Sequence, residues 1–276
     1  MRPGYLIVNP RSGEPGGDEE LLRAAEAQGV ACHVLRPDDD PVELARRADA
    51  PVLGVAGGDG SLAAVAAVAM ERDLPFVCVP AGTRNHFARD VGLDRRDPAA
   101  ALAAFGGVER RIDVGRVNGR LFLNNLSLGL YADLVRRREH HRRQGEALAG
   151  LRAIPRLARE RRRLRARLDG ETVIARILLV ANNAYEISLY TLGERNSLEE
   201  GRLHLYAADG WLPTRWTERS GSSFQLELDR DESIAAADGE PLTLRSPLEL
   251  ECLPGALRLL LPPQRFSQDA PDSGLG

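Results

Sequence analysis

The chain contains no lysine, because all 37 of the basic residues among its 276 positions are arginine. This absence excludes mechanisms that need a lysine amine, such as a Walker A phosphate site, the β3 lysine of protein kinases or a Schiff base. Any phosphate that the chain binds must therefore be held by backbone N–H groups, arginines, hydroxyl groups or a metal ion.

Cysteine and long apolar runs are also scarce. Cys32, Cys78 and Cys252 are far apart and form no CxxC pair, so we expect buried thiols in a reducing, cytoplasmic compartment. The run Leu62–Met70 is much shorter than the ~20 residues of a membrane span, and the N-terminus lacks the apolar segment of a signal peptide. We expect a protein that contacts a membrane without crossing it.

The overall composition is that of a globular protein, with 43% hydrophobic and 28% charged residues. This chain length is sufficient for one large domain or two modest ones. The formal net charge of -3 gives no reason to expect a nucleic-acid partner.

The first hundred residues alternate between short apolar runs and helical patterns, which predicts a parallel sheet covered by helices. The predicted strands are Tyr5–Val8, Val30–Leu35, Pro51–Ala56 and Leu74–Val79. The predicted helices are Glu19–Gln28, Pro41–Ala48 and a segment from a Ser61 cap to about Arg72.

After about Arg110 the pattern changes to short β-type runs separated by turns, which predicts an antiparallel domain. The runs are Ile112–Val117, Leu121–Leu126, Val173–Val180, Leu203–Ala207, Phe224–Leu228, Leu248–Cys252 and Leu257–Leu261. We therefore predict an α/β domain at 1–110, a β-rich domain at 111–261 with an arginine-rich helical insertion at 134–168, and a flexible tail at 262–276.

The loop Gly57-Gly58-Asp59-Gly60-Ser61 follows an apolar strand and opens a helix. Glycines let the backbone approach a ligand closely, and the N–H groups at a helix start favour a phosphate. An aspartate in such a loop indicates that Mg²⁺ accompanies the anion, as it does with a nucleoside triphosphate. The alternative is a plain glycine turn followed by an N-cap serine.

Two further polar loops follow predicted strands, at Asn9–Gly13 and at Pro80–Asn85. The carboxyl ends of parallel strands share one edge of an open sheet, where ligands bind. We expect the three loops to converge on one ligand.

Five stretches resemble, in order, the diacylglycerol kinase catalytic-domain family, which includes bacterial lipid kinases and sphingosine kinases and is related to NAD kinases. They are LIVNPRSG, GVAGGDGSLAAV, VPAGTRNHFARDVGL, RIDVGRVNGRLFLNNLSLGLYADLV and DGEPL. The resemblance implies a Rossmann-like α/β nucleotide-binding domain and a C-terminal antiparallel β-sandwich, with ATP and Mg²⁺ in the cleft between them. It also implies transfer of the γ-phosphate to the hydroxyl of a lipid such as diacylglycerol.

The same resemblance assigns site residues. The nucleotide-binding positions would be Asn9, Ser12, Gly57, Gly58, Asp59, Gly60, Ser61, Thr83 and Asn85, and the metal-binding positions Asp59 and Asp113. In the DGE motif, Glu240 would be the catalytic base that accepts the hydroxyl proton, and Asp238 its charge partner near the metal.

Two of these carboxylates have simpler explanations. Asp238-Gly239 is also a common hairpin-turn pair. Asp113 at a strand end is also explained by pairing with Arg110 or Arg111. Asn182, Asn183 and Tyr185 resemble a family segment that faces the cleft.

The sequence departs from the family at His86, where many members have aspartate, and at Ser61, where threonine is commoner. The missing carboxylate leaves the arrangement of the metal open. His86 could contact phosphate or cap a helix.

The arginine-rich stretch suggests how the chain meets its substrate. Its basic residues are Arg136, Arg137, Arg138, Arg142, Arg143, Arg152, Arg156, Arg159, Arg161, Arg162, Arg163, Arg165 and Arg167. Each basic residue near anionic lipid contributes roughly 1 kcal/mol, so we expect docking on the inner face of the cytoplasmic membrane. The alternatives are a solvated helical face or, with few aromatics nearby, nucleic-acid binding.

Two other functions stay open, although the first shares mainly the GGDG loop and fits the NPRSG and DGEPL stretches less well. One is a small-molecule kinase of the NAD kinase type, and the other is a lipid-binding module that keeps the fold without turnover. The sequence identifies neither the acceptor lipid nor the oligomeric state.

Overall fold

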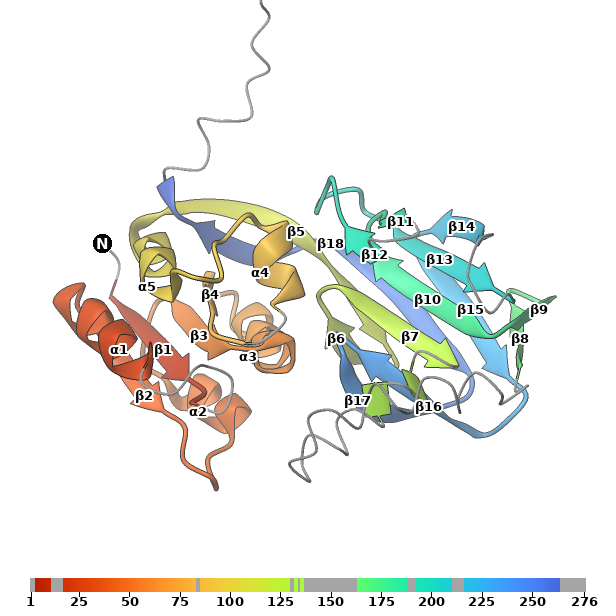
Figure 1. Cartoon of the computed structure of the whole chain (residues 1–276), viewed down its shortest axis with the longest axis horizontal. Helices are drawn as coiled ribbons and strands as arrows, with labels where there is room; N and C mark the ends of the chain where they lie inside the picture. The colour runs from red at the N-terminus through yellow and green to blue at the C-terminus, as the bar shows by residue number, and fades with distance from the viewer. Residues whose placement is uncertain are drawn as a thin grey trace, which may run out of the picture. The chain divides into compact units, whose positions relative to one another are not determined.

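The computed structural model describes residues 3–10, 17–82, 85–129, 132–133, 135–136, 163–187, 192–209 and 216–263. The chain forms two compact units (Figure 1), one of Met1–Arg111 with Leu257–Gly276 and the other of Ile112–Ala256. The predicted domain boundaries at residues 110 and 261 do not include the return of the chain to the first unit, which begins at Leu257. The tail beyond residue 263 lies outside the described residues.

The first unit contains a parallel sheet, as predicted. Its strands are β1 (Gly4–Val8), β2 (Val30–Val34), β3 (Leu53–Gly57), β4 (Phe76–Pro80) and the C-terminal end of β18 (Leu248–Leu261). They lie in the order β2-β1-β3-β4-β18, and every neighbouring pair is parallel. All residues of β3 and β4 are buried, which explains why both read as continuous apolar runs.

Helices cover this sheet. They are α1 (Gly17–Ala27), α2 (Pro41–Arg47), α3 (Asp59–Glu71), α4 (His86–Asp90), α5 (Pro98–Ala101) and the 3-10 helix η1 (Leu102–Gly106). The α1 helix packs on β2, α3 on β3, and α4 and α5 on β4. None of the helices in the described part of the chain is both long and apolar enough to cross a bilayer.

The start of α3 differs from the prediction. The helix begins at Asp59 with Gly58 as its N-cap residue, so the expectation that Ser61 caps it is wrong. A glycine N-cap allows the helix to begin three residues earlier, so Ser61 lies in the first turn and its hydroxyl can bond to another loop.

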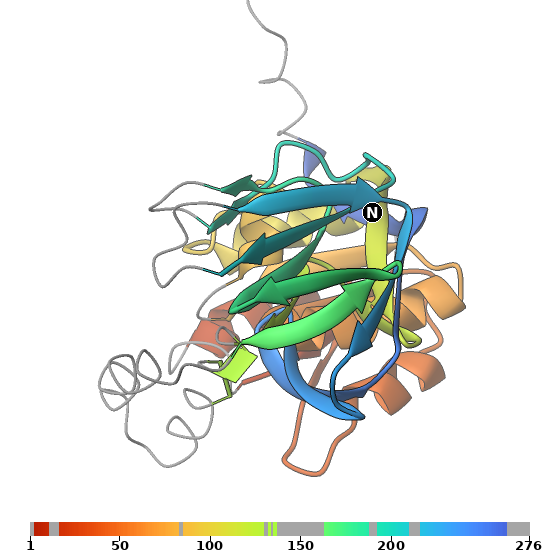
Figure 2. The same cartoon turned by 90° about the vertical axis from the view of Figure 1, so that its right-hand side faces the viewer.

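The second unit is a sandwich of two antiparallel sheets, most of whose strands are coloured green to blue in Figure 2. One sheet has the order β14-β13-β10-β7-β16-β17. Its strands are β7 (Asn125–Gly129), β10 (Ile177–Asn182), β13 (Leu203–Ala208), β14 (Thr217–Gly221), β16 (Glu232–Ala237) and β17 (Glu240–Arg245).

The other sheet contains the N-terminal part of β18, followed in order by β15, β8 and β9, and β5 pairs with both β18 and β6. These strands are β5 (Val108–Val117), β6 (Arg120–Phe122), β8 (Leu164–Leu168), β9 (Glu171–Ala175) and β15 (Ser223–Leu228). Leucines such as Leu128, Leu205, Leu226 and Leu250 from the two sheets share one core. A separate pair joins β11 (Glu186–Ile187) and β12 (Leu192–Glu194).

Four of the predicted β-type runs have different boundaries in the fold. The run Leu121–Leu126 is split between β6 and β7, and the run Val173–Val180 between β9 and β10. In contrast, the last two predicted runs are one strand, β18. Its N-terminal part pairs with β15 and its C-terminal part with β4, so Pro254 and Gly255, at a φ of 58°, lie where one ladder ends and the other begins.

The predicted helical insertion at 134–168 is wrong at its C-terminal end, because Leu164–Leu168 forms strand β8. Its burial alternates along the strand, with Ala166 and Leu168 inside and Arg165 and Arg167 outside. This period of two favours a strand on a sandwich core, whatever the helix propensity of arginine. Residues 134 and 137–162 of the insertion lie outside the described residues.

Candidate functional site

The polar loops of the first unit meet at the carboxyl edge of its sheet. The Asn9 side chain, after β1, donates a hydrogen bond from Nδ2 to Ser61 Oγ at 2.9 Å. The backbone N–H of Asn9 donates to Ala56 O at 2.8 Å. The loop after β1 is therefore joined to the start of α3, as expected for these two residues.

Two glycines allow the loops to pack this closely. A Cβ atom on Gly82, in the loop after β4, would lie 2.5 Å from Gly58 Cα. A Cβ atom on Gly57 would lie 3.0 Å from Ser61 Cβ. Because backbone atoms cannot yield at such distances, the contact between the loops after β3 and β4 requires glycine at position 82.

Asn85 shapes the loop after β4. It is fully buried and adopts a left-handed conformation with a φ of 47°. Its Oδ1 accepts from the Gly82 N–H at 3.0 Å, and its Nδ2 donates to Gly82 O at 2.6 Å. The side chain thus closes its own loop, a role that asparagine performs well in turns.

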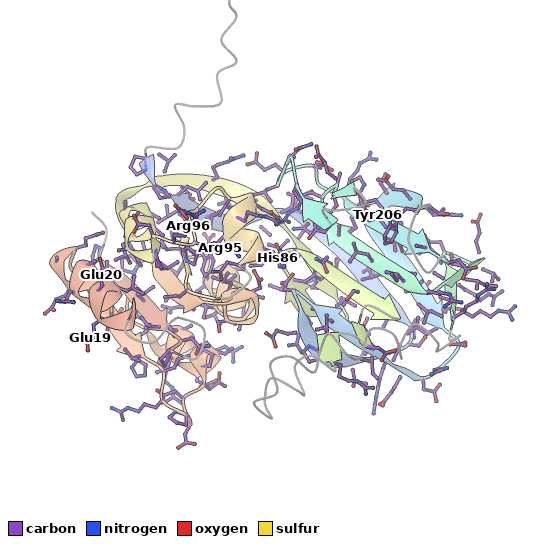
Figure 3. All side chains as sticks on the ribbon, in the orientation of Figure 1. Glu19, Glu20, His86, Arg95, Arg96 and Tyr206 are labelled. Atoms are coloured by element: carbon purple, nitrogen blue, oxygen red, sulfur yellow. The ribbon has the colours of Figure 1, made fainter. Side chains whose placement is uncertain are left out.

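Asp59 has a role that the sequence did not reveal. The residue is 6% exposed, and its carboxylate accepts from the N–H groups of His86 and Phe87, each at 3.2 Å. These amides open α4, whose own N-cap residue, Asn85, makes no side-chain cap. Asp59 therefore caps α4 from a distance of 27 positions in the chain. His86, at this helix start, is labelled in Figure 3.

The N-terminus of α3 is the part of this edge suited to an anion. The helix has 13 residues, and its N-cap Gly58 provides no side-chain acceptor for the amides of the first turn. Gly60 and Ser61 belong to that turn. Helix starts of this kind bind phosphate through backbone N–H groups. The predicted positions Ser12 and Thr83 lie outside the described residues.

In the second unit, the DGE motif forms the turn between β16 and β17. Asp238 and Gly239 have φ angles of 49° and 80°, so the interpretation as a two-residue hairpin turn is confirmed. Glu240 is the first residue of β17 and is exposed.

Asp238 is only 8% exposed, and its carboxylate binds three consecutive backbone amides. Oδ2 accepts from Leu123 N at 2.7 Å, and Oδ1 accepts from Asn124 N at 2.7 Å and Asn125 N at 3.1 Å. Hydrogen bonds to an ionised acceptor are about twice as strong as neutral ones, so Asp238 fixes the segment between β6 and β7.

Asp113 joins three segments of the second unit. It is 3% exposed, and its carboxylate accepts from Gly201 N at 2.6 Å and from Gly255 N at 2.9 Å. Its backbone N–H donates to Leu198 O at 2.8 Å. Neither explanation offered by the sequence, a metal-linked network or an arginine pair, included these amide contacts.

The predicted metal-binding residues belong to different units, Asp59 to the first and Asp113 to the second. Within the described residues, no three His, Cys, Asp or Glu side chains are grouped so as to hold a metal ion. Asp59 and Asp113 each use both carboxylate oxygens for backbone amides. A metal ion would therefore depend mainly on oxygens that its own ligand or water supplies.

A buried polar cluster lies next to Asp238, and sequence analysis missed most of it. Asn182 donates from Nδ2 to Asp113 O at 2.8 Å and to Leu123 O at 3.2 Å. Arg195, 8% exposed, donates to the same segment. The family resemblance had singled out Asn182, Asn183 and Tyr185, but no sequence pattern pointed to Arg195.

The two buried thiols, Cys78 and Cys252, are poorly suited to act as nucleophiles. Burial raises the pKa of Cys252 to about 12, with a further contribution from the Asp113 charge. Burial, together with the Asp59 charge, also raises the pKa of Cys78 well above its usual value. Both thiols stay protonated at neutral pH and are therefore inert as nucleophiles.

Few of the arginines proposed for membrane docking are described. Arg165 and Arg167 are exposed on β8, and Arg163 pairs with Asp209 at 3.0 Å. Arg136 lies 3.8 Å from Asp133. Ion pairing of this kind is typical of a solvated face, so these four residues do not decide between the interpretations.

Comparisons with known proteins agree with the motifs. Residues 3–117 match the family model of the diacylglycerol kinase catalytic domain. A probable lipid kinase YegS-like from Pseudomonas aeruginosa is 42% identical over 122 residues, which are 41% of this chain and 40% of that protein. A diacylglycerol kinase from Bacillus subtilis is 31% identical over 153 residues, 49% of this chain and 48% of that protein. The matched segments thus span less than half of these curated relatives.

Solved structures extend the likeness to the whole fold. A crystal structure of a diacylglycerol kinase from Bacillus anthracis has a TM-score of 0.72 at 19% identity, and covers 95% of this chain and 98% of its own. A putative diacylglycerol kinase from the same organism has a TM-score of 0.73 at 20% identity, covering 96% and 98%. At this identity the likeness establishes a shared fold.

Proposed function

We propose that the chain is a member of the diacylglycerol kinase catalytic-domain family, whose model residues 3–117 match, and that it is an ATP-dependent lipid kinase. It transfers the γ-phosphate of ATP to the hydroxyl of a lipid such as diacylglycerol. The observation that supports this most is the hydrogen bond that joins Asn9 to Ser61, at the uncapped start of α3. This edge offers amides and hydroxyls, as a lysine-free phosphate site must.

The triphosphate is bound, in this proposal, by the first unit. The amides of Gly58–Ser61 and the side chains of Asn9 and Ser61 surround the phosphates, and Ser12 and Thr83 complete the site. Asn85 acts by keeping the loop after β4 in its left-handed turn. Backbone donors fixed in this way need no reorganisation when charge develops.

Mg²⁺ is proposed to enter with the nucleotide. It would be held chiefly by phosphate oxygens and water, as Mg²⁺ is in many phosphoryl-transfer sites, and it would neutralise the phosphates. Asp59, already bound to two amides, would orient water molecules around the ion. Asp113 is then a structural residue and not a ligand.

The second unit supplies the base. Glu240 takes the proton of the lipid hydroxyl as the oxygen forms a bond to the γ-phosphorus, and the bond from that phosphorus to the β–γ bridging oxygen breaks. ADP and the phosphorylated lipid leave, and the proton passes from Glu240 to solvent. An exposed carboxylate suits this last step.

The acceptor is proposed to be reached at the inner face of the cytoplasmic membrane, with the arginine-rich segment against anionic lipid. The outward-facing Arg165 and Arg167 on β8 are the described residues that fit this role. We propose no nucleic-acid partner.

The deciding experiment is a phosphorylation assay with Mg²⁺ and γ-labelled ATP against diacylglycerol, a sphingoid base, a polyprenol and NAD. Labelled lipid in the wild type, lost in Glu240→Gln, supports the proposal. Labelled NAD alone would identify a small-molecule kinase. Binding to liposomes without any labelled product would identify a lipid-binding module without turnover.

A further inference from the structure

Arg195 is a buried cation whose contacts centre on one short segment. The side chain donates from Nη1 to Leu123 O at 2.8 Å and to Asn182 O at 3.1 Å. It donates from Nη2 to Asn124 Oδ1 at 2.9 Å. Taking a guanidinium out of water is costly unless several acceptors compensate, and here three do so with the planar geometry that arginine provides.

The third residue of the segment is tied to the same place through an aromatic ring. Asn125 donates from Nδ2 to the Tyr185 hydroxyl at 3.0 Å. The guanidinium carbon of Arg195 lies 5.9 Å from the centre of the Tyr185 ring, within range of a cation–π interaction. Residues 123–125 are therefore each held, directly or through Tyr185, by Arg195.

The opposite side of this segment faces Asp238. All three N–H groups of residues 123–125 donate to its carboxylate. A buried cation binds acceptors of the segment and a buried anion binds its donors. In a low-dielectric interior, hydrogen bonds arranged in this way polarise and strengthen one another.

We infer that Arg195 is a positioning residue for the base, an inference that rests on the proposed function of Glu240. Asp238 keeps its left-handed φ of 49° while its carboxylate is bound to the three amides, and Glu240 follows two residues later. Arg195 fixes the amides, the amides fix Asp238, and the turn fixes Glu240. Without Arg195, the Glu240 carboxylate is displaced although it is chemically unchanged.

A hydrogen-exchange and kinetic experiment on the full chain tests this chain of contacts. Arg195→Met and Arg195→Lys are compared with Arg116→Met, which removes a half-exposed arginine of the same unit that pairs with Glu251 at 2.6 Å. Exchange is followed in peptides covering residues 120–128 and 236–244. The kcat and the KM for ATP are measured with the acceptor found in the phosphorylation assay.

We expect Arg195→Met to speed hydrogen exchange in both peptides. It should also lower kcat by about 100-fold, the cost typical of a reacting group displaced by about 1 Å. The KM for ATP should stay within about twofold of the wild-type value. Arg195→Lys should recover part of this loss, because an ammonium keeps the charge but cannot reach three acceptors together. The double variant with Glu240→Gln should be no slower than Glu240→Gln alone. Arg116→Met should change none of these quantities.

The two ways of failing are separable. Unchanged exchange in peptide 236–244 of a folded Arg195→Met protein would overturn the inference, as would a normal kcat or an additive double variant. Where the wild type phosphorylates no acceptor, the proposed function fails, and the exchange data alone decide whether Arg195 holds the turn.

Discussion

Buried aspartates act differently in the two units. In the first, Asp59 accepts two amides at 3.2 Å and caps a helix that starts 27 positions later. In the second, Asp238 accepts three amides, two of them at 2.7 Å, from a segment 113–115 positions earlier. The first unit makes its polar edge from loops that follow neighbouring strands, whereas the second builds its turn on contacts between distant segments.

This difference suggests a division of labour. The first unit offers backbone amides and hydroxyls, which bind a charged ligand without changing protonation. The second offers a carboxylate, Glu240, on a turn held by buried charges. Binding and proton transfer should therefore be separable by mutation, and the predictions below test that separation from the largest expected effect to the smallest.

Glu240→Gln should give the largest change. Removing a general base typically costs a factor of about 10² to 10⁴ in rate. The first unit keeps its loops, so the ATP affinity that we propose for it should not change. Turnover measured by product formation and affinity measured by calorimetry check both halves. Near-normal turnover of this variant would show that Glu240 is not the general base, and would contradict the separation of binding and proton transfer between the two units.

Asp238→Asn should be more destabilising than Asp59→Asn. An amide has one oxygen in place of two and no charge, so we expect a loss of about 3 kcal/mol at Asp238 and about 1–2 kcal/mol at Asp59. Urea unfolding followed by fluorescence and far-UV circular dichroism would measure both. Equal losses would mean that the third amide and the shorter distances at Asp238 contribute nothing.

Gly82→Ala should damage the first unit at its loops. The new methyl would lie 2.5 Å from Gly58 Cα, so the loops after β3 and β4 must separate, at a cost of about 1–3 kcal/mol. Nucleotide affinity, measured by calorimetry, should fall with it. Gly29→Ala is the matched control, because Gly29 has a φ of 68° with open space around it, and should lower stability without altering nucleotide affinity.

Tyr206→Phe should give the smallest effect, a loss of about 1 kcal/mol at neutral pH, because the buried hydroxyl accepts a hydrogen bond from Tyr185 N at 3.0 Å. A second effect, on the pH dependence of stability, should appear at alkaline pH. Burial raises the pKa of Tyr206, labelled in Figure 3, from 10.0 to about 12. Since the folded state holds this proton more tightly, its contribution is complete below pH 10 and is lost as the pH rises toward 12. Thermal unfolding of wild type and variant between those values should show a shallower decline for the variant. Parallel curves would indicate that Tyr206 does not titrate there.

The first unit was readable from sequence because its information is local. Buried parallel strands such as β3 and β4 appear as apolar runs, and their loops must share an edge whatever else the chain does. The meeting of Asn9 and Ser61 followed from this rule. The cap that Asp59 gives to α4 did not, because nothing at position 59 indicates which helix start lies near its carboxylate.

Fewer features of the second unit could be predicted, because its contacts join segments that are distant in the sequence. The turn at Asp238-Gly239 has a local pattern and was predicted. Its hydrogen bonds to residues 123–125, however, depend on pairing between β7 and β16. Arg195 follows the short strand β12 and has no pattern around it. Strand β8 was mistaken for helix because the arginines that precede it continue into it, and only the sandwich core imposes the period of two.

The path of β18 has a consequence for how the protein is made. Its residues Leu259 and Leu260 pair with Phe76 and Val77, so the first unit gains a strand from nearly the end of the described chain. During synthesis, the edge of β4 that pairs with β18 stays unpaired until more than 180 further residues have been made. A gene fragment ending at Arg111 would leave that apolar edge open permanently, and we expect it to aggregate unless residues 257–263 are fused back onto it.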